Sequence, residues 1–286
     1  MKYRYLLFSG LLLAGMQVNA QELYVSSDPA SNIAAHSLSI RLTNKFFRME
    51  QERVTGMRFA PELMWGLNKK LMLRVTGYAS NQMQASIRPE GASVYAKYRF
   101  LSQDELHSHF RMAAYVKGAV IDNPYVPAAI NGHSPAGYKN EDIDLEGMSS
   151  GVAGGVIATQ LIHKLALSGT VGYNRFLNNT RHNLPDELSR NAVNYSLSAG
   201  YLLLPFKYKS YDQTNLNLYV EFLGKANTDR IGRGHYVDIA PAIQFIFNST
   251  TRLDVSYRTQ LAGDMQRNIF NTFLVRLEHN IFNLKK

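Results

Sequence analysis

The sequence predicts an all-β fold, a transmembrane antiparallel up-and-down β-barrel of about twelve strands. Three observations predict it. An export signal opens the chain, polar and apolar residues alternate with a period of two along much of the remainder, and the connections between the alternating segments are by turns short and long. A barrel wall that separates lipid from a polar interior needs one apolar and one polar face on every strand.

The export signal occupies residues 1–20. Lys2 and Arg4 are followed by an apolar core from Tyr5 to Met16, and Val18-Asn19-Ala20 places small residues where a signal peptidase cleaves. The remaining chain has no run of apolar residues long enough for a membrane-spanning helix. If the mature protein crosses a membrane, it therefore does so as a closed barrel, since only such a barrel satisfies the backbone of strands in lipid.

Alternation is clearest where whole strands can be divided into two faces. Residues 251–261 place Leu253, Val255 and Leu261 on one face and Arg252, Asp254 and Arg258 on the other. The same period predicts strands at 36–48, 54–67, 70–80, 90–102, 106–120, 147–161, 165–176, 191–205, 213–224, 235–248, 250–262 and 268–283.

The predicted connections alternate in length. Those on one side are mostly short, at 68–69, 102–105, 162–164 and 248–249, with a longer one at 206–212. Those on the other side are mostly longer, at 80–89, 121–146, 177–190, 225–234 and 262–267. This asymmetry is typical of short periplasmic turns and long extracellular loops. Residues 21–35 then form a periplasmic N-terminal segment, and residues 36–286 form the barrel domain.

A soluble sandwich or lipocalin-like barrel would show the same period, and three features weigh against it. The polar face carries Arg and Lys that a filled core does not tolerate unpaired. Residues 151–156 are small and suit a thin wall. Aromatic residues near the strand ends are consistent with interfacial girdles; these are Trp65, Tyr78, Tyr98, Phe100, Tyr173, Phe176, Tyr201, Phe206, Tyr236, Phe245, Phe247, Phe270, Phe273 and Phe282.

A family resemblance rests on the start of the mature chain. Residues 22–32 contain the run Asp28-Pro29-Ala30-Ser31-Asn32 before the first strand, and this run resembles the opening of a group of uncharacterised Gram-negative outer-membrane β-barrel proteins. More loosely, the whole chain resembles the transporter-like barrels grouped with the MetA-type proteins of phenol-degradation pathways. The resemblance implies an outer-membrane barrel with a transport role and brings no catalytic residues.

The polar face, turned inward, predicts a basic lumen. Arg matches carboxylate and phosphate, and a low-dielectric wall concentrates the opposite ion. We expect a porin-like channel or transporter for small, anionic solutes. The alternative is a structural or surface-interaction barrel, plugged because these cations pair with Glu62, Glu221, Asp254 and Glu278. The candidates for solute binding are Arg74, Lys97, Arg99, Arg111, Lys117, Arg252, Arg258 and Arg276; the same face holds Arg41, Arg58 and Asp238.

Other chemistry finds little support. The chain has no Cys, which excludes disulfides, Cys-ligated metals and a cysteine nucleophile. Residues 147–151 match G-x-S-x-G, but a strand follows where the nucleophile elbow needs a helix. His107 and His109 share a strand face without a third metal ligand. Residues 141–146 are acidic but lack calcium-loop spacing, so we interpret them as a solvated external loop. We expect no enzyme activity, metal or cofactor.

The location follows from the export signal. We expect the mature protein in the outer membrane, with membrane lipid and the barrel-assembly machinery as its partners. The formal charge of +9 could suggest a nucleic-acid partner, but the export signal and the absence of a basic cluster argue against it.

Overall fold

The computed structural model describes residues 24–106, 108–127, 137–206, 212–282 and 284. The predicted signal peptide lies outside the described residues, as does His107. Within the described residues no helix has the length and apolar character to cross a bilayer.

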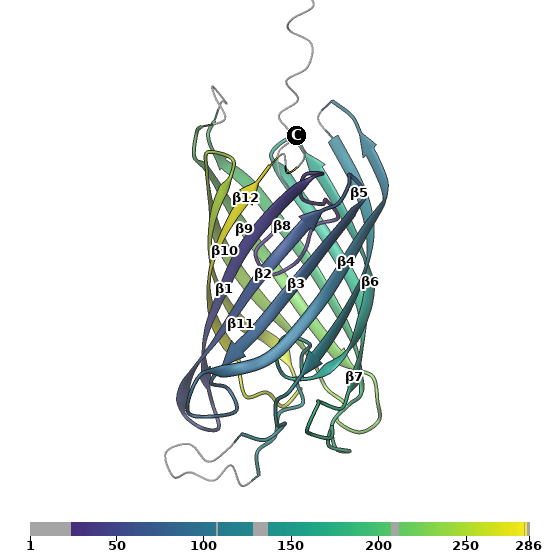
Figure 1. Ribbon diagram of the computed structural model, residues 1–286, viewed down its shortest axis with the longest axis vertical. Coiled ribbons are helices and arrows are strands. Elements are labelled where there is room, and N and C mark those ends of the chain that lie inside the picture. Colours follow the sequence, from purple (N-terminus) through teal and green to yellow (C-terminus); the bar gives the residue numbers. More distant parts are fainter. Residues whose placement is uncertain (1–23, 107, 128–136, 207–211, 283, 285–286) are drawn as a thin grey trace, which may run out of the picture.

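Twelve antiparallel strands close into one up-and-down barrel, in which β1 pairs with both β2 and β12. Figure 1 shows the strands inclined to the long axis of the molecule. The strands are β1 (Ser37–Met49), β2 (Val54–Gly66), β3 (Leu71–Ser80), β4 (Arg88–Asp104), β5 (Ser108–Ile121), β6 (Ser150–Ile162), β7 (Leu165–Leu177), β8 (Asn191–Leu204), β9 (Asn215–Asn227), β10 (His235–Phe247), β11 (Thr251–Gly263) and β12 (Asn271–Ile281).

The predicted fold class, strand number and order are confirmed. Among the larger differences in boundaries are the starts of β6 and β12, each three residues later than predicted. Before β6 the reason is local. Gly147 has a φ of +117°, which belongs to an irregular segment that bends into the barrel rather than to a strand.

The two ends of the barrel differ as the connection lengths predict. We call the end that carries the β2–β3, β4–β5, β6–β7, β8–β9 and β10–β11 connections the short-turn end, and the opposite one the long-loop end. The chain enters β1 at the short-turn end, where the backbone N–H of His36 donates to Gly66 and that of Leu284 donates to His36. The C-terminus lies at this end in Figure 1.

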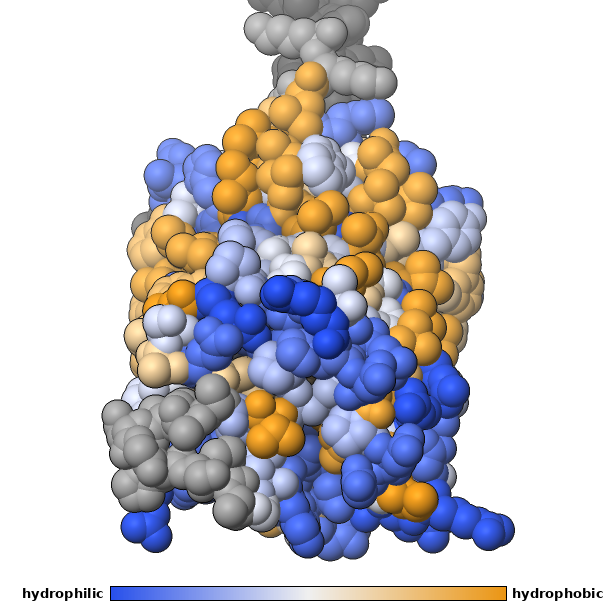
Figure 2. All heavy atoms as spheres, turned by 60° about the horizontal axis from the view of Figure 1, so that its bottom comes forward, coloured by the Kyte–Doolittle hydropathy of each residue, from blue (hydrophilic) through white to orange (hydrophobic). Residues whose placement is uncertain are grey.

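The outer wall is apolar. Exposed side chains such as Val94, Val116, Val171, Leu197 and Leu277 come from alternate positions of their strands. Figure 2 turns the long-loop end toward the viewer and shows hydrophilic residues gathered there, with hydrophobic residues on the wall behind. The apolar side chains of this outer wall are not covered by any other part of the chain that the structure describes. An exposed apolar surface that surrounds a barrel is expected to face lipid.

Two details of the predicted faces are wrong. Tyr78, Phe176 and Tyr236 are buried inside the barrel and do not belong to an outer aromatic girdle. Each of them occupies the strand face that carries the lumenal side chains, so the period of two places it inward.

The small residues of β6 are the second correction. The sequence predicts the small residues 151–156 in the outer wall, but Gly155 belongs to the inward face of β6. A Cβ on Gly155 would meet the Tyr115 ring at 2.8 Å, and one on Gly172 of β7 would meet the Tyr115 hydroxyl at 2.1 Å. These glycines make room for a lumenal tyrosine on β5, whose ring stacks on Tyr95 with centroids 5.4 Å apart.

The lumen has an apolar cluster toward each end. At the long-loop end, Ile143, Leu145 and Met148 of the β5–β6 loop pack against Tyr78 and Phe176. Toward the short-turn end, Tyr24 and Val25 pack with Leu161, Ala166 and Tyr219. In each cluster a segment from outside the strands folds into the barrel and packs against strand residues. A polar space remains between the two clusters.

Candidate functional site

A cavity of about 400 Å³ lies in this polar space. Strands around the barrel form its wall, the segment 25–28 closes it toward the short-turn end, and residues 140–148 close it toward the long-loop end. Nine basic and five acidic side chains line it, so the wall carries a net positive charge. They are Arg41, Lys45, Arg58, Arg74, Lys117, Lys225, Arg258, Arg267 and Arg276, with Asp28, Glu62, Asp142, Asp144 and Glu146.

The eight predicted solute-binding residues divide into three groups. Arg74, Lys117, Arg258 and Arg276 line the cavity. Lys97 and Arg252 are buried and bonded to other groups. Arg99 and Arg111 lie toward the short-turn ends of β4 and β5, outside the cavity wall.

Cross-strand register explains the ion pairs of β1, β2, β11 and β12. Arg41 lies opposite both Glu62 and Glu278, and Arg252 lies opposite Glu278 from the other side. The Glu278 carboxylate accepts from Arg41 at 2.6 Å and from Arg252 at 2.8 Å. Opposed charges in adjacent strands are close enough to pair, which compensates for their removal from water.

Asp254 continues this network. It lies opposite Arg276, at 3.8 Å, and its carboxylate is 3.3 Å from Arg252. The pairing of lumenal cations with Glu62, Asp254 and Glu278, which the plugged alternative requires, is therefore present, whereas Glu221 has a different role.

The N-terminal segment binds inside the lumen. The sequence predicts a periplasmic segment at residues 21–35 but does not predict its contacts with the lumenal wall. Glu221 accepts hydrogen bonds from three successive backbone amides, those of Val25 at 3.0 Å, Ser26 at 2.7 Å and Ser27 at 2.8 Å. Lys97 donates to the backbone carbonyls of Pro29 and Ser31, each at 2.7 Å. One buried carboxylate and one buried ammonium thus hold the backbone of this segment against the wall.

Side chains add to these backbone contacts. Arg111 donates to the Ser31 hydroxyl at 2.8 Å, and the Ala30 N–H donates to Thr159 at 2.9 Å. Arg74 binds the Asp28 carboxylate through two nitrogens, at 3.2 and 3.1 Å. Three of the eight predicted cations, Arg74, Lys97 and Arg111, therefore contact the mature chain's own N-terminal segment.

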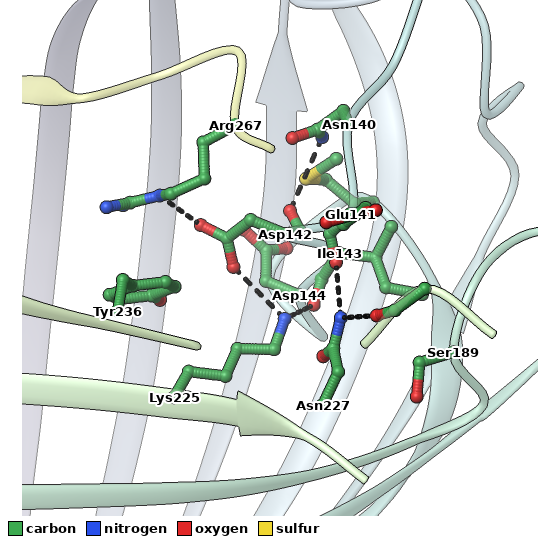
Figure 3. Close-up of polar contacts among 12 residues, drawn as sticks. Asn140, Glu141, Asp142, Ile143, Asp144, Ser189, Lys225, Asn227, Tyr236 and Arg267 are labelled. Carbon is green, nitrogen blue, oxygen red and sulfur yellow. Dashed lines mark hydrogen bonds and ion pairs between the residues drawn. The ribbon is translucent and has the colours of Figure 1, made fainter. Parts of the chain in front are cut away.

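The acidic stretch 141–146 folds into the lumen, so its interpretation as a solvated external loop is wrong. Figure 3 shows Asp142 between Arg267 and Lys225, and both distances are 3.0 Å. Lys225 also donates to the Ile143 carbonyl at 2.5 Å. The lumen holds an excess of strand-borne cations, and this loop supplies carboxylates that partly neutralise them.

Two further carboxylates of the loop pair with the opposite side of the barrel. Asp144 accepts from Arg58 of β2 at 3.1 Å, and Glu146 accepts from Lys45 of β1 at 2.6 Å. Lys117 of β5 is 4.0 Å from Glu146. The loop therefore bridges β1 and β2 with β9, across the barrel, and constricts the lumen.

These pairs shift the pKa of the loop carboxylates. Burial alone would raise the pKa of Asp142, but Lys225 and Arg267 outweigh it and lower the pKa to about 2. Lys45 is the largest influence on Glu146, and with Lys117 it holds the pKa of that carboxyl well below its usual range despite burial. Both groups remain charged at neutral and mildly acidic pH.

The residues considered above for other chemistry make contacts within the barrel and its turns. The Ser149 hydroxyl of the G-x-S-x-G match lies 3.0 Å from the Ser150 carbonyl oxygen, 3.2 Å from that of Leu177 and 3.1 Å from the Tyr125 hydroxyl. His109 contacts Asp104 at 2.8 Å. Across the described ranges, no three His, Cys, Asp or Glu side chains gather as a metal site would require.

Sequence reasoning missed Asp28, Asp142 and Glu146 as lumenal groups. A signal for them was available in the charge count, since the predicted lumen has ten basic side chains and five acidic ones. The remaining counter-charges had to come from segments outside the strands.

No family model matches this sequence, and no curated protein matches it either. Solved structures do resemble the fold. An outer-membrane channel from Pseudomonas putida F1 aligns with a TM-score of 0.57 and 10% identity, over 90% of this chain and 100% of the other. The KdgM porin aligns over 84% of this chain and 98% of its own at 8% identity, with a TM-score of 0.48.

The likeness to the Pseudomonas channel establishes the fold. This chain is built as an outer-membrane type of β-barrel, and the resemblance to outer-membrane barrel proteins is confirmed at that level.

Proposed function

We propose that the protein is an outer-membrane channel for small, anionic solutes, exported by a signal peptide at residues 1–20 that is then cleaved. Its partners are membrane lipid on the outer wall and the barrel-assembly machinery during insertion. The observation that carries the proposal is the cavity within a closed, lipid-facing barrel, because its wall has nine basic and five acidic side chains. A low-dielectric wall concentrates the field of this excess charge on the lumen and attracts anions.

The architecture supports passage through this space. Twelve strands make a barrel between the small barrels filled by side chains and the open porins. The N-terminal segment and residues 137–149 of the β5–β6 loop narrow the lumen from its two ends. In the proposed channel they act as constrictions that move aside, and the cavity between them is the central part of the route.

A plugged barrel is the competing function, because ion pairs hold both constrictions: Asp28 with Arg74 in the N-terminal segment, and Asp142 with Lys225 and Arg267 in the β5–β6 loop. Current through planar bilayers that contain the purified mature protein distinguishes the two. We expect discrete conductance steps and, in a potassium chloride gradient, a reversal potential on the anion-selective side. Absence of steps in protein that is demonstrably folded would support the plugged barrel.

The charge argument is tested by a pair of double variants. Lys45→Gln with Lys117→Gln removes two lumenal cations, and we expect the reversal potential to move toward the cation-selective side. Lys69→Gln with Lys70→Gln removes the same charge from an exposed turn outside the lumen and should leave the reversal potential unchanged. Equal effects of the two pairs would contradict an anion-selective lumen.

A further inference from the structure

The Asp28 carboxylate sits in a pocket on the lumenal wall. Arg74 binds it in the fork geometry, with one nitrogen at 3.2 Å from Oδ1 and another at 3.1 Å from Oδ2. This arrangement is the one by which guanidinium groups recognise free carboxylates. Asp28 is the acidic residue of the run Asp28-Pro29-Ala30-Ser31-Asn32, so a segment that is not part of the barrel wall supplies the anion.

The pocket itself belongs to the wall. Arg74 on β3 lies directly opposite Tyr95 on β4, and its guanidinium carbon is 4.3 Å from the centre of the Tyr95 ring. Tyr95 is in turn stacked on Tyr115, and the Arg74 Nε is 3.5 Å from Glu62. A cation–π contact with Tyr95 and an ion pair with Glu62, both on strands, therefore hold the guanidinium in addition to its contacts with Asp28.

Electrostatics of the pocket favour an ionised carboxylate. Burial would raise the pKa of Asp28, yet Arg74, Lys97 and Arg41 hold it well below the usual range. Asp28, Arg41, Arg74 and Tyr95 all line the cavity. An anion that enters the cavity therefore reaches the same guanidinium that Asp28 now occupies.

We propose that Arg74 and Tyr95, with Lys97 beside them, form a carboxylate-binding subsite of the lumen, and that Asp28 occupies it as an internal competitor of carboxylate solutes. This proposal adds a class of solute to the proposed function, and it rests on that function only for the claim that the bound carboxylate is a transported solute. When the N-terminal segment leaves the wall, the subsite is open; when it returns, Asp28 displaces the solute.

Acetate tests the subsite, because it reproduces the end of the aspartate side chain. In the purified mature protein carrying Asp28→Ala, we expect acetate to raise the midpoint of thermal unfolding, whereas the wild type needs an acetate concentration at least about tenfold higher for the same shift. Acetamide, which has the same shape without the charge, should have no effect. Asp28→Ala combined with Arg74→Gln should lose the response to acetate.

Two further variants keep the test decisive. Asp186→Ala removes an aspartate whose side chain is 99% exposed, and it should behave as the wild type. If Asp28→Ala does not fold, Asp28→Asn keeps the size of the side chain and should still respond at lower acetate than the wild type. Equal responses to acetate and acetamide, or a wild-type response equal to that of the variant, would overturn the subsite.

Bilayer current separates this inference from the proposed function. If acetate stabilises Asp28→Ala but no variant conducts, the subsite stands and the channel fails. If the protein conducts anions but acetate has no specific effect on Asp28→Ala, the channel stands and the subsite is overturned.

Discussion

Single side chains determine how the N-terminal segment is held. Glu221 is fully buried and accepts three amide hydrogen bonds from consecutive residues, a geometry that recognises backbone rather than sequence. Lys97 does the same for two carbonyls. Hydrogen bonds to a charged group each contribute about 1.5–3 kcal/mol when buried, so these two residues account for much of the segment's attachment.

Glu221→Gln tests this attachment. The amide keeps the shape but loses the negative charge, and we expect the hold on the segment to weaken by about 2 kcal/mol. Amide hydrogen exchange at Val25, Ser26 and Ser27 should accelerate by roughly thirtyfold, since about 1.4 kcal/mol corresponds to a factor of ten. Glu105→Gln changes an exposed glutamate and is the matched control. Unchanged exchange in Glu221→Gln would show that other contacts hold the segment.

At the scale of elements, the β5–β6 loop converts an open barrel into a constricted one. Its carboxylates Asp142, Asp144 and Glu146 each pair with a cation on a different strand or loop, and Ile143, Leu145 and Met148 pack in the apolar cluster below the long-loop end. Removing one partner of a buried ion pair costs about 3–5 kcal/mol, because the other charge is left unpaired, and Asp142 with Lys225 is the most buried of these three pairs. Each ion pair therefore stabilises the loop only when both of its partners are present and charged.

The pH dependence of this anchor follows from the pKa of Asp142. In the folded protein it is about 2, below the ordinary 3.8, so its contribution to stability is complete above the ordinary pKa and is lost as the pH falls through 2. In the wild type we expect hydrogen-exchange protection of residues 140–146, corrected for intrinsic rates, to persist to about pH 4 and to disappear near pH 2.

Asp142→Asn should lose much of this protection already at neutral pH, because Lys225 and Arg267 then face no charge at that position. Asp186→Asn, at an exposed position of the β7–β8 loop, serves as the control. A wild-type loop that has already opened at about pH 4, where an ordinary aspartate titrates, would show that Asp142 does not anchor it.

At the scale of the whole molecule, the barrel separates two solvents. The same strand carries an apolar side chain toward lipid and a polar one toward the lumen at neighbouring positions. Leu197, 61% exposed near the middle of β8, faces outward, and the adjacent Ser196 lines the cavity. Closure of β1 on β12 leaves no strand edge, as a barrel in lipid requires.

The pair Leu197→Arg and Ser196→Arg tests the two solvents. An arginine on the lipid face near the bilayer midplane destabilises a membrane barrel by about 2–4 kcal/mol, whereas the lumen is polar and should accept it at a smaller cost. Unfolding and refolding in urea with lipid vesicles measures both. Equal losses of stability for the two variants would argue that the outer wall does not face lipid.

Much of this architecture could be predicted from the strands themselves. Alternation within 251–261 and its counterparts fixes which face points inward, since a one-residue shift would reverse every side chain. Lumenal positions of Arg74, Lys117, Arg258 and Arg276 follow from that rule. The same rule predicts that Tyr78 and Phe176 point inward, as they do. The prediction of an outer girdle was wrong for them because it considered only their position near strand ends.

The sequence by itself determined the period of two, the strand order and the basic lumen, which the structure confirms, because these depend on local alternation and on connection lengths. The export signal also comes from the sequence alone and stays a prediction. Only the tertiary structure decided what fills the lumen. Residues 24–35 and 137–149 have no period, and their positions depend on pairing with charges far away in the chain, such as Asp28 with Arg74 and Asp142 with Lys225. Such long-range pairing is a property of the closed barrel, since closure is what brings those strands around one shared interior.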